Sequence, residues 1–311
     1  MNKNEEIKKL LEEGKSYRYI SKKLSCSNRV IREVKEETID KLEDKILKEI
    51  KKLNLNEDEV NKFIKQINKP EKVRNTYDHF YDSKNVRIGI IADTHIGSKD
   101  FDEKLFYDSI KIFDKEKVSG IYHCGDIIEG MSNREGHIYE LNILGVSNQL
   151  KKASELLSLY KQPVHFITGN HDEWSNKKSN QGVIIGDLLE SMIPNSKFLG
   201  EYFADINLAD NIKMRLTHEG SSAYALSYSG QKRINAIQGG DKPDIICNGH
   251  IHKALYMFYR NIHFIEAGTF QGQTPFMRMK GSPSMKGFYV LDIGFNKKGV
   301  NEFVPKFYPG Y

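Results

Sequence analysis

Apolar residues in the first 70 positions recur at intervals of three and four, which is the spacing of amphipathic helices. Gly14 ends the first expected helix, and Ser16 and Ser27 are suitable N-caps for two more short helices. Three short helices with a tight turn before the last are typical of a helix-turn-helix, which we expect over residues 1–38. The positions that set this spacing are Ile7, Leu10, Leu11, Ile20, Leu24, Val30, Ile31 and Val34.

A helical extension is expected over residues 39–70. Its apolar residues repeat from Leu42 to Leu53, and a capping box at Asn56 begins another helix that Pro70 stops. Two roles stay open for the helices at 40–67: they form a homodimer contact, or they pack as a small bundle. Residues 71–85 are polar and aperiodic, so we expect a linker there.

The periodicity changes at Val86, where short β-rich runs begin to alternate with helix-like or loop segments. Such alternation predicts an α/β domain over residues 86–311, and the last runs are close enough in sequence for hairpins. The runs are VRIGIIA, GIYHC, VHFIT, IKMRLT, DIICN, IHFIEAG and GFYVLDI.

Composition and charge distinguish residues 1–75 from the rest of the chain. The 311 residues are 39% hydrophobic and 29% charged, as in a globular chain with a sizeable core. No signal peptide is recognisable and no apolar run approaches the roughly 20 residues that cross a bilayer, so no membrane association is expected. Three scattered cysteines fit a reduced, cytoplasmic setting. The net charge of +5 lies entirely in residues 1–75, which hold 20 Lys and Arg against 15 Asp and Glu and therefore read as an appended basic module.

Five motifs of Asp, His and Asn follow the first five β-rich runs. Ligands of open α/β sheets collect beyond the carboxyl ends of the strands, so these side chains are expected to converge. Carboxylate oxygens with imidazole nitrogens suit Mn, Fe, Zn or Co, and they suit neither a pure Ca site nor a Cys-rich Zn site. The motifs are D-T-H at 93–95, G-D at 125–126, G-N-H-D at 169–172, T-H at 217–218 and G-H-I-H at 249–252.

In their order and spelling, these motifs resemble the calcineurin-like metallophosphoesterase family, whose pattern is D-x-H, G-D, G-N-H-D/E, H and G-H-x-H. The resemblance spans residues 86–293 and implies a four-layer α/β/β/α sandwich beside the small all-α module. It also implies two divalent metal ions, Mn in first place and Fe, Zn or Co as alternatives. The implied ligands are Asp93, His95 and His252 for one metal, Asn170, His218 and His250 for the other, and Asp126 between them.

The resemblance further implies the reaction. A hydroxide shared by both metals would attack phosphorus in line, because metal coordination lowers the pKa of water toward neutrality. His171 would be the catalytic histidine, contacting the phosphate and aiding departure of the leaving oxygen, and Asp172 would orient its imidazole. No covalent phosphoenzyme is expected.

Other polar and aromatic residues receive simpler interpretations. Trp174 could stack on a base, although packing under its own loop is favoured. Three histidines on β-rich runs are interpreted as core residues: His123, His165 and His263. Three residues of the loop after the second motif are weighed evenly between substrate contact and a solvated loop: Glu129, Arg134 and His137.

Two features favour DNA as the substrate. The runs ADTHIGSKDF, GDIIEGM and ITGNHDEW resemble the SbcD-type DNA-repair nucleases and the small exonuclease subunit of archaeal replicative polymerases. Protein phosphatases of the family run G-D-x-x-D-R-G, and the Arg of that motif is lacking here. Residues 14–37 resemble resolvase- and homeodomain-like helix-turn-helix segments, with seven cations and one acid between Gly14 and Lys35. The side chains expected to contact DNA are Asn28, Arg29, Arg32 and Lys35.

We therefore expect a DNA-directed nuclease with an N-terminal DNA-binding module. Two other functions stay open. One is a phosphodiesterase or phosphatase acting on cyclic nucleotides or small molecules. The other is a DNA-binding regulator with a non-catalytic metal site, against which the intact set of five motifs argues.

Overall fold

The computed structural model describes residues 3–12, 17–27, 30, 31, 34, 76–79, 81, 84–179, 184–220 and 225–311. The chain divides into two compact units, residues 1–72 and 73–311. The predicted DNA contacts at Asn28, Arg29, Arg32 and Lys35 lie outside the described residues, as do the helices expected at 40–67.

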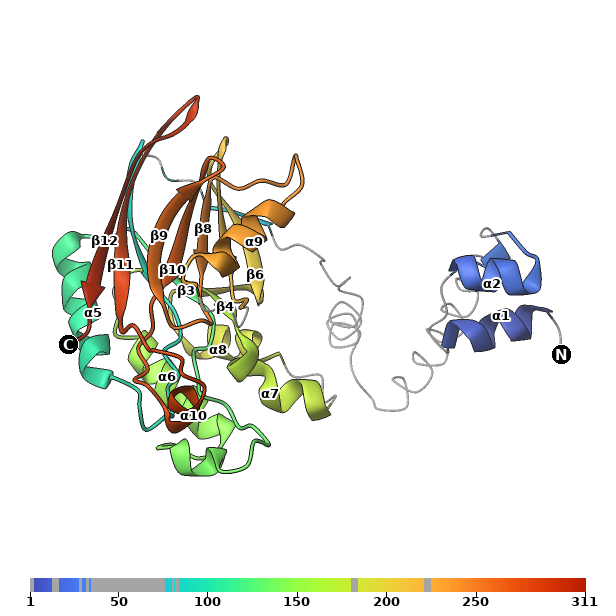
Figure 1. Cartoon of the computed structure of the whole chain (residues 1–311), viewed down its shortest axis with the longest axis horizontal. Helices are drawn as coiled ribbons and strands as arrows, with labels where there is room; N and C mark the ends of the chain where they lie inside the picture. The colour runs from blue at the N-terminus through green and yellow to red at the C-terminus, as the bar shows by residue number, and fades with distance from the viewer. Residues whose placement is uncertain are drawn as a thin grey trace, which may run out of the picture. The chain divides into compact units, whose positions relative to one another are not determined.

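The N-terminal unit contains helices α1 (Lys3–Glu12) and α2 (Tyr17–Leu24) (Figure 1). Ile7, Ile20 and Ile31 are fully buried in one apolar cluster, which Leu10 and Val34 complete. These are inward-facing positions of the predicted pattern, because residues three and four apart share one face of a helix. The pattern is therefore confirmed for α1 and α2.

The C-terminal unit contains two six-stranded sheets that pack face to face (Figure 1). In spatial order, the first sheet consists of β1 (Thr76–Asp78), β6 (Phe203–Ala209), β7 (Ile212–Thr217), β8 (Ile245–Asn248), β10 (Ile262–Ala267) and β9 (Ala254–Tyr259). In spatial order, the second sheet consists of β12 (Gly299–Pro309), β11 (Gly287–Asn296), β2 (Asn85–Ile91), β3 (Ile121–Cys124), β4 (Val164–Thr168) and β5 (Ser196–Glu201).

The space between the sheets is filled by side chains that alternate along the strands. Ile88 and Ile90 of β2 meet Met214 and Leu216 of β7 in one buried cluster. Alternate positions of a strand face the same side of a sheet, so each run contributes every second residue to this layer. The three cysteines are free thiols, and those at 124 and 247 are buried here as small core residues.

Helices cover both outer faces of the sandwich. On the second sheet lie α5 (Glu103–Glu116), α6 (Val146–Leu157) and α8 (Ile185–Met192), which bury a second apolar cluster. On the first sheet, α9 (Tyr228–Ala236) packs Ile234 against Phe264. These layers confirm the predicted α/β/β/α architecture. The remaining helical segments are α7 (Asn170–Ser179), α10 (Pro275–Met279) and the 3₁₀ turn η1 (His137–Glu140). Among the described helices, none has the length and apolarity needed to span a bilayer.

All seven β-rich runs form strands. The last two of them form hairpins, but with β9 and β12, which lie outside the expected runs, whereas the neighbouring runs β8 and β10 pair in parallel. The structure adds β1, β5, β6, β9 and β12. The strand β1 lies within the stretch that was expected to be linker and pairs in parallel with β6.

Candidate metal centre

The five motifs follow five strand ends. Asp93 comes after β2, Asp126 after β3 and Asn170 after β4, three strands that run parallel in the second sheet. His218 follows β7, and the G-H-I-H motif follows β8, a parallel pair in the first sheet. Since the ends of parallel strands share one edge, each sheet offers its donors at a single edge, and the two edges meet.

One donor group combines a carboxylate with two imidazoles. His95 Nε2 lies 3.0 Å from His252 Nε2 and 3.8 Å from Asp93 Oδ1. His252 Nε2 is 3.4 Å from the same carboxylate oxygen. All three side chains are buried. Their donor atoms therefore converge on one small volume.

The second donor group lies beside the first. His218 Nε2 is 3.0 Å from Asp126 Oδ2 and 3.2 Å from Asn170 Oδ1. Asn170 Oδ1 also lies 2.8 Å from His250 Nδ1. Asp126 Oδ2 is in addition 3.8 Å from His95 Nε2 of the first group. The structure thus brings all seven predicted ligands together, with Asp126 between the groups.

The donor set fits a divalent cation. His252 Nδ1 is buried without a hydrogen-bond partner in the described part of the chain. Burial lowers the pKa of His218, but the charge and hydrogen bond of Asp126 outweigh it and raise the pKa to about 9. The Asp93 carboxyl is also buried, yet the neighbouring His252 and His95 hold its pKa well below the usual value. The carboxylates and imidazoles thus stabilise one another's charged forms: carboxylates that favour positive charge on a neighbouring ring also attract cations, and mixed O and N donors suit Mn, Fe, Zn or Co.

Five of these residues have a left-handed backbone. The φ angles are +51° at Asp93, +47° at His95, +54° at Asp126, +81° at His250 and +53° at His252. Non-glycine residues seldom adopt this region, although Asp and His enter it more easily than branched residues. Unusual backbone of this kind clusters at functional sites, where the surrounding structure enforces it.

The glycines of the motifs make room for His218. A Cβ on Gly169 would lie 2.3 Å from Asp126 Oδ1 and 2.6 Å from the His218 ring. A Cβ on Gly125 would lie 2.6 Å from His218 Nδ1, and one on Gly249 would lie 2.9 Å from the same atom. Cβ atoms do not approach other heavy atoms this closely, so only glycine fits around this imidazole.

His171 lies beside the two groups, and its ring is held by Glu129. His171 Nδ1 donates to the Glu129 carbonyl oxygen at 2.9 Å, so Nε2 is the ring nitrogen that this contact does not occupy. The ring centroid of Trp174 lies 3.6 Å from that of His171. Trp174 therefore packs on the imidazole, in line with the preferred expectation that it packs locally.

The Glu129 carboxylate ties several histidines together. Its Oε1 accepts from His137 Nε2 at 2.9 Å and lies 3.5 Å from His171 Nδ1. Its Oε2 lies 2.8 Å from His95 Nδ1. Charge attraction from His171 and His95, together with hydrogen bonds from His137 and His171, outweighs burial and holds the Glu129 pKa well below normal. Glu129 and His137, weighed evenly in the sequence, are therefore buried parts of the site.

Asp172 differs from the prediction. Its Oδ1 accepts from the Ile128 amide at 2.9 Å and its Oδ2 from the Gly169 amide at 2.8 Å. Both oxygens therefore serve main-chain donors of the motif loops, and the orienting contact on the imidazole comes from Glu129 instead. Burial, followed by repulsion from Asp126, raises the Asp172 pKa to about 7.

The structure also places the remaining residues that the sequence singled out. Arg134 forms a two-pronged ion pair with Glu140, at 3.0 and 2.7 Å. His123 is fully buried, as expected for a core residue, with Nε2 3.1 Å from Thr94 Oγ1. His165 and His263, also expected in the core, are only half-buried, and His263 stacks on Phe303.

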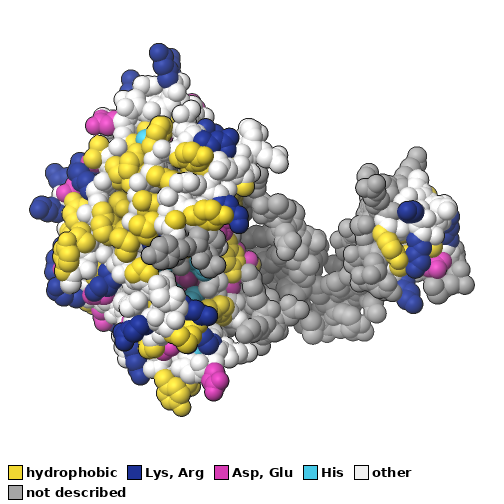
Figure 2. Space-filling view, in the orientation of Figure 1, with side chains coloured by type: hydrophobic (Ala, Val, Ile, Leu, Met, Phe, Trp, Pro, Cys, Tyr) yellow, Lys and Arg dark blue, Asp and Glu magenta, His cyan; other side chains and the backbone are white. Residues whose placement is uncertain are grey.

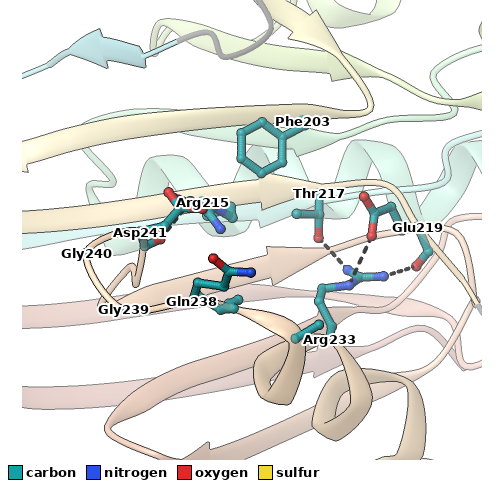
Figure 3. Close-up of a pocket in the computed structure, with 11 residues that line it drawn as sticks. Phe203, Arg215, Thr217, Glu219, Arg233, Gln238, Gly239, Gly240 and Asp241 are labelled. Carbon is teal, nitrogen blue, oxygen red and sulfur yellow. Dashed lines mark hydrogen bonds and ion pairs between the residues drawn. The ribbon is translucent and has the colours of Figure 1, made fainter. Parts of the chain in front are cut away.

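Sequence reasoning missed a polar network behind the metal residues. Arg233 donates to Thr217 Oγ1 at 2.7 Å and to the Glu219 carbonyl at 2.7 Å (Figure 3). Asn248, immediately before the G-H-I-H motif, donates to the buried Glu266 at 2.7 Å. The network connects the ends of β7 and β8. No sequence motif predicts it, because its members lie far apart in sequence.

A cavity of about 690 Å³ opens beside this network (Figure 3). Arg215 and Arg233 line it, and both are engaged by carboxylates: Arg215 by Asp205 and Asp241, and Arg233 by Glu219. The cavity is therefore lined by paired charges, and it is separate from the converging metal donors.

The fold and the donor set are those of a metallophosphoesterase domain. The family model of the calcineurin-like phosphoesterases matches residues 86–254, and the chain belongs to this family.

Two similar curated proteins are archaeal. The DNA polymerase II small subunit of Methanothermobacter thermautotrophicus is 26% identical over 239 residues, covering 62% of this chain and 49% of that protein. That of Archaeoglobus fulgidus is 26% identical over 245 residues, covering 64% and 49%. The chain thus spans about half the length of these relatives. Among solved structures, an archaeal phosphodiesterase aligns with a TM-score of 0.41 and 17% identity, over 72% of this chain and all of that one.

Proposed function

We propose that this protein is a metal-dependent phosphodiesterase that cleaves DNA. The observation that carries the chemistry is the convergence of seven O and N donors at the edges of two sheets. Relatives that are subunits of DNA polymerases support DNA as the substrate. The basic N-terminal quarter, which holds the whole net charge of +5, supports it as well.

The donors divide into two metal positions. Asp93, His95 and His252 would hold one ion, and Asn170, His218 and His250 the other, with Asp126 shared. Two divalent ions there, Mn²⁺ in first place, supply an activated water and neutralise charge on the phosphoryl oxygens.

The protein's own residues supply positioning and a proton. His171 keeps Nδ1 on the Glu129 carbonyl, so its Nε2 is the atom that donates to a phosphate oxygen or protonates the leaving oxygen. Trp174 fixes the plane of the His171 ring by packing on it. The His171 side chain keeps 19% of its surface exposed, which leaves it accessible to substrate.

The test uses purified full-length protein with Mn²⁺. Labelled single- and double-stranded DNA, a cyclic dinucleotide and bis-p-nitrophenyl phosphate are offered in parallel. We expect DNA cleavage by the wild type, loss of about a hundredfold or more in His171→Ala, and little change in the control His263→Gln. Turnover of only the small esters would contradict the DNA assignment. Tight duplex binding without any turnover would instead favour the regulator.

We further propose that Asn28, Arg29, Arg32 and Lys35 contact DNA. We plot the logarithm of the DNA-binding constant against the logarithm of the salt concentration. Neutralising the three cations in the full chain should make the negative slope of this plot shallower by up to about 3, because each phosphate contact releases counterions. An unchanged slope in duplex binding would refute this role.

A further inference from the structure

The chain between β10 and β11 forms a rim rooted in the metal centre. The Phe270 amide donates to the Asp93 carbonyl at 3.1 Å, and the Met285 amide donates to the His252 carbonyl at 2.8 Å. Gln271 Nε2 donates to Glu129 Oε2 at 2.8 Å. Both ends of this segment are therefore fixed to residues of the candidate site, and the part between them, residues 272–284, projects from its edge.

A short helix gives this projecting part a defined shape. Thr274 caps α10 by accepting from the Met277 amide at 3.2 Å, and Pro275 occupies the first helical turn. Pro is suited to that position because its ring presets the helical φ. Side chains on α10 are thus presented in a fixed arrangement.

The rim interleaves exposed apolar and basic side chains. Met279 is 72% exposed, Phe276 38% and Met285 36%. Arg278 and Lys280 are exposed between and beside them. Among the described residues, neither cation has a carboxylate within ion-pair distance, unlike Arg134 and several lysines of the same unit. Lys280 Nζ lies over the Phe276 ring, 5.8 Å from its centroid. The rim therefore offers positive charge next to a soft, polarisable surface.

The loop that begins at Glu129 contacts α10. The Arg134 guanidinium lies over the Phe276 ring, 4.7 Å from its centroid, and so joins α10 to the loop that begins at Glu129. That loop carries three exposed apolar side chains: Ile138 at 54%, Tyr139 at 78% and Leu144 at 53%. Figure 2 shows histidine and acidic side chains in a hollow of this face, with Lys, Arg and hydrophobic side chains around it.

We propose that α10 and its flanks, residues 272–285, form the seat for a single nucleic-acid strand entering the metal centre. This proposal rests on the proposed DNA phosphodiesterase activity and adds the form of DNA that the site takes. Arg278 and Lys280 bind phosphates, and Met279 packs against an unstacked base. The Phe276 ring, which has the Arg134 guanidinium over it, offers its remaining exposed surface to a second base. Basic grooves with interleaved stacking residues recognise single strands of any sequence.

The first experiment compares two substrates that share the reactive group. Bis-p-nitrophenyl phosphate has a diester but no flanking nucleotides, whereas a labelled single-stranded oligonucleotide has both. The variants are Phe276→Ala with Met279→Ser, and Arg278→Gln with Lys280→Gln, all at exposed positions. We expect kcat/KM on the oligonucleotide to fall at least about fivefold in each pair while the small diester changes less than about twofold.

Matched controls lie away from the rim. Lys297→Gln with Lys298→Gln removes two exposed charges at the far end of β11, and Met192→Ser removes a methionine that is 41% exposed on α8. If the wild type cleaves DNA and the rim variants behave like these controls, the seat is refuted while the nuclease survives. Equal losses on both substrates would also refute it, because they indicate damage to the metal centre.

A second experiment does not depend on cleavage. An oligonucleotide carrying 4-thiothymidine is irradiated with metal-free full-length protein, and the adducts are mapped by mass spectrometry. We expect adducts on residues 272–285 and on the facing loop. Adducts confined to other residues, or none, would overturn the seat. Adducts at the rim without cleavage in Mn²⁺ would instead overturn the nuclease and keep the strand-binding surface.

Discussion

Glu129 holds two hydrogen-bond donors at once, so exchanging its carboxylate for an amide must disturb one of them. The Ser132 amide donates to His137 Nδ1 at 3.3 Å, which fixes the proton of His137 on Nε2. That Nε2–H donates to Glu129 Oε1, and Gln271 donates to Oε2. In Glu129→Gln, either orientation of the new amide places an NH₂ group against a donor.

The expected loss follows from the burial of this carboxylate, whose side chain is 4% exposed. Leaving a buried donor without an acceptor costs about 1–3 kcal/mol. Outer partners of metal-ligating histidines contribute about 10–100-fold to metal affinity or activity, which is the same energy range. Because Glu129 also lies against His95, one of the candidate ligands, we expect a loss of about 10–100-fold in Mn²⁺ affinity, kcat/KM or both.

Mn²⁺ binding by calorimetry and hydrolysis of bis-p-nitrophenyl phosphate measure these two quantities. Glu135→Gln is the matched control, because Glu135 lies on the same loop and is exposed. Circular dichroism should show both variants folded. A folded Glu129→Gln with affinity and rate within about twofold of wild type would refute the positioning role.

Other consequences concern stability and fit. Burial raises the pKa of Glu266 to about 8 from 4.5, so the folded state binds a proton that the unfolded chain has lost. Between these pH values the free energy of unfolding should fall as pH rises, by up to about 1.4 kcal/mol per pH unit. Urea unfolding of metal-free Glu266→Gln should lack this slope, and parallel curves would contradict the reasoning. Asp205→Ala should cost about 3 kcal/mol, because it strips the buried Arg215 of a bidentate partner, and a loss under about 1 kcal/mol in urea unfolding would argue otherwise. Gly169→Ala should weaken Mn²⁺ binding by about tenfold or more, whereas Gly239→Ala, whose Cβ enters open space, should bind like wild type in the same titration.

The strands found from sequence are runs rich in β-branched residues. Three of the strands that escaped prediction, β6, β12 and β1, have an identifiable reason. Asp205 interrupts the apolar pattern of β6, yet it is buried because Arg215 pairs with it from β7. The strand β12 lies at a sheet edge and contains Pro305, which an edge tolerates because one side of the strand needs no partner. The strand β1 has three residues, too few for any periodicity.

The candidate site likewise has residues that the sequence predicts and residues whose roles only the structure reveals. Its seven donors could be named because each belongs to a short motif after a strand, and the topology brings such ends together. For Glu129 the sequence could not decide between substrate contact and a solvated loop, because only the fold of the intervening loop brings its partner His137 into contact with it. Asp172 was given the wrong partner, since main-chain amides, invisible in a residue pattern, hold both of its oxygens.

The left-handed backbone at Asp93, His95, Asp126, His250 and His252 sets activity against stability. A side chain in this conformation costs of order 1 kcal/mol relative to glycine. A glycine at His95, His250 or His252 would relax the main chain while deleting a donor atom, whereas Asp93 and Asp126 also accept from the amides of His250 and His171. Selection for thermostability alone would therefore favour glycine over the metal ligands at these turns, so the metal centre would be lost stepwise. An inactive descendant of this protein should be recognisable by glycines at these positions and by a higher melting temperature without metal.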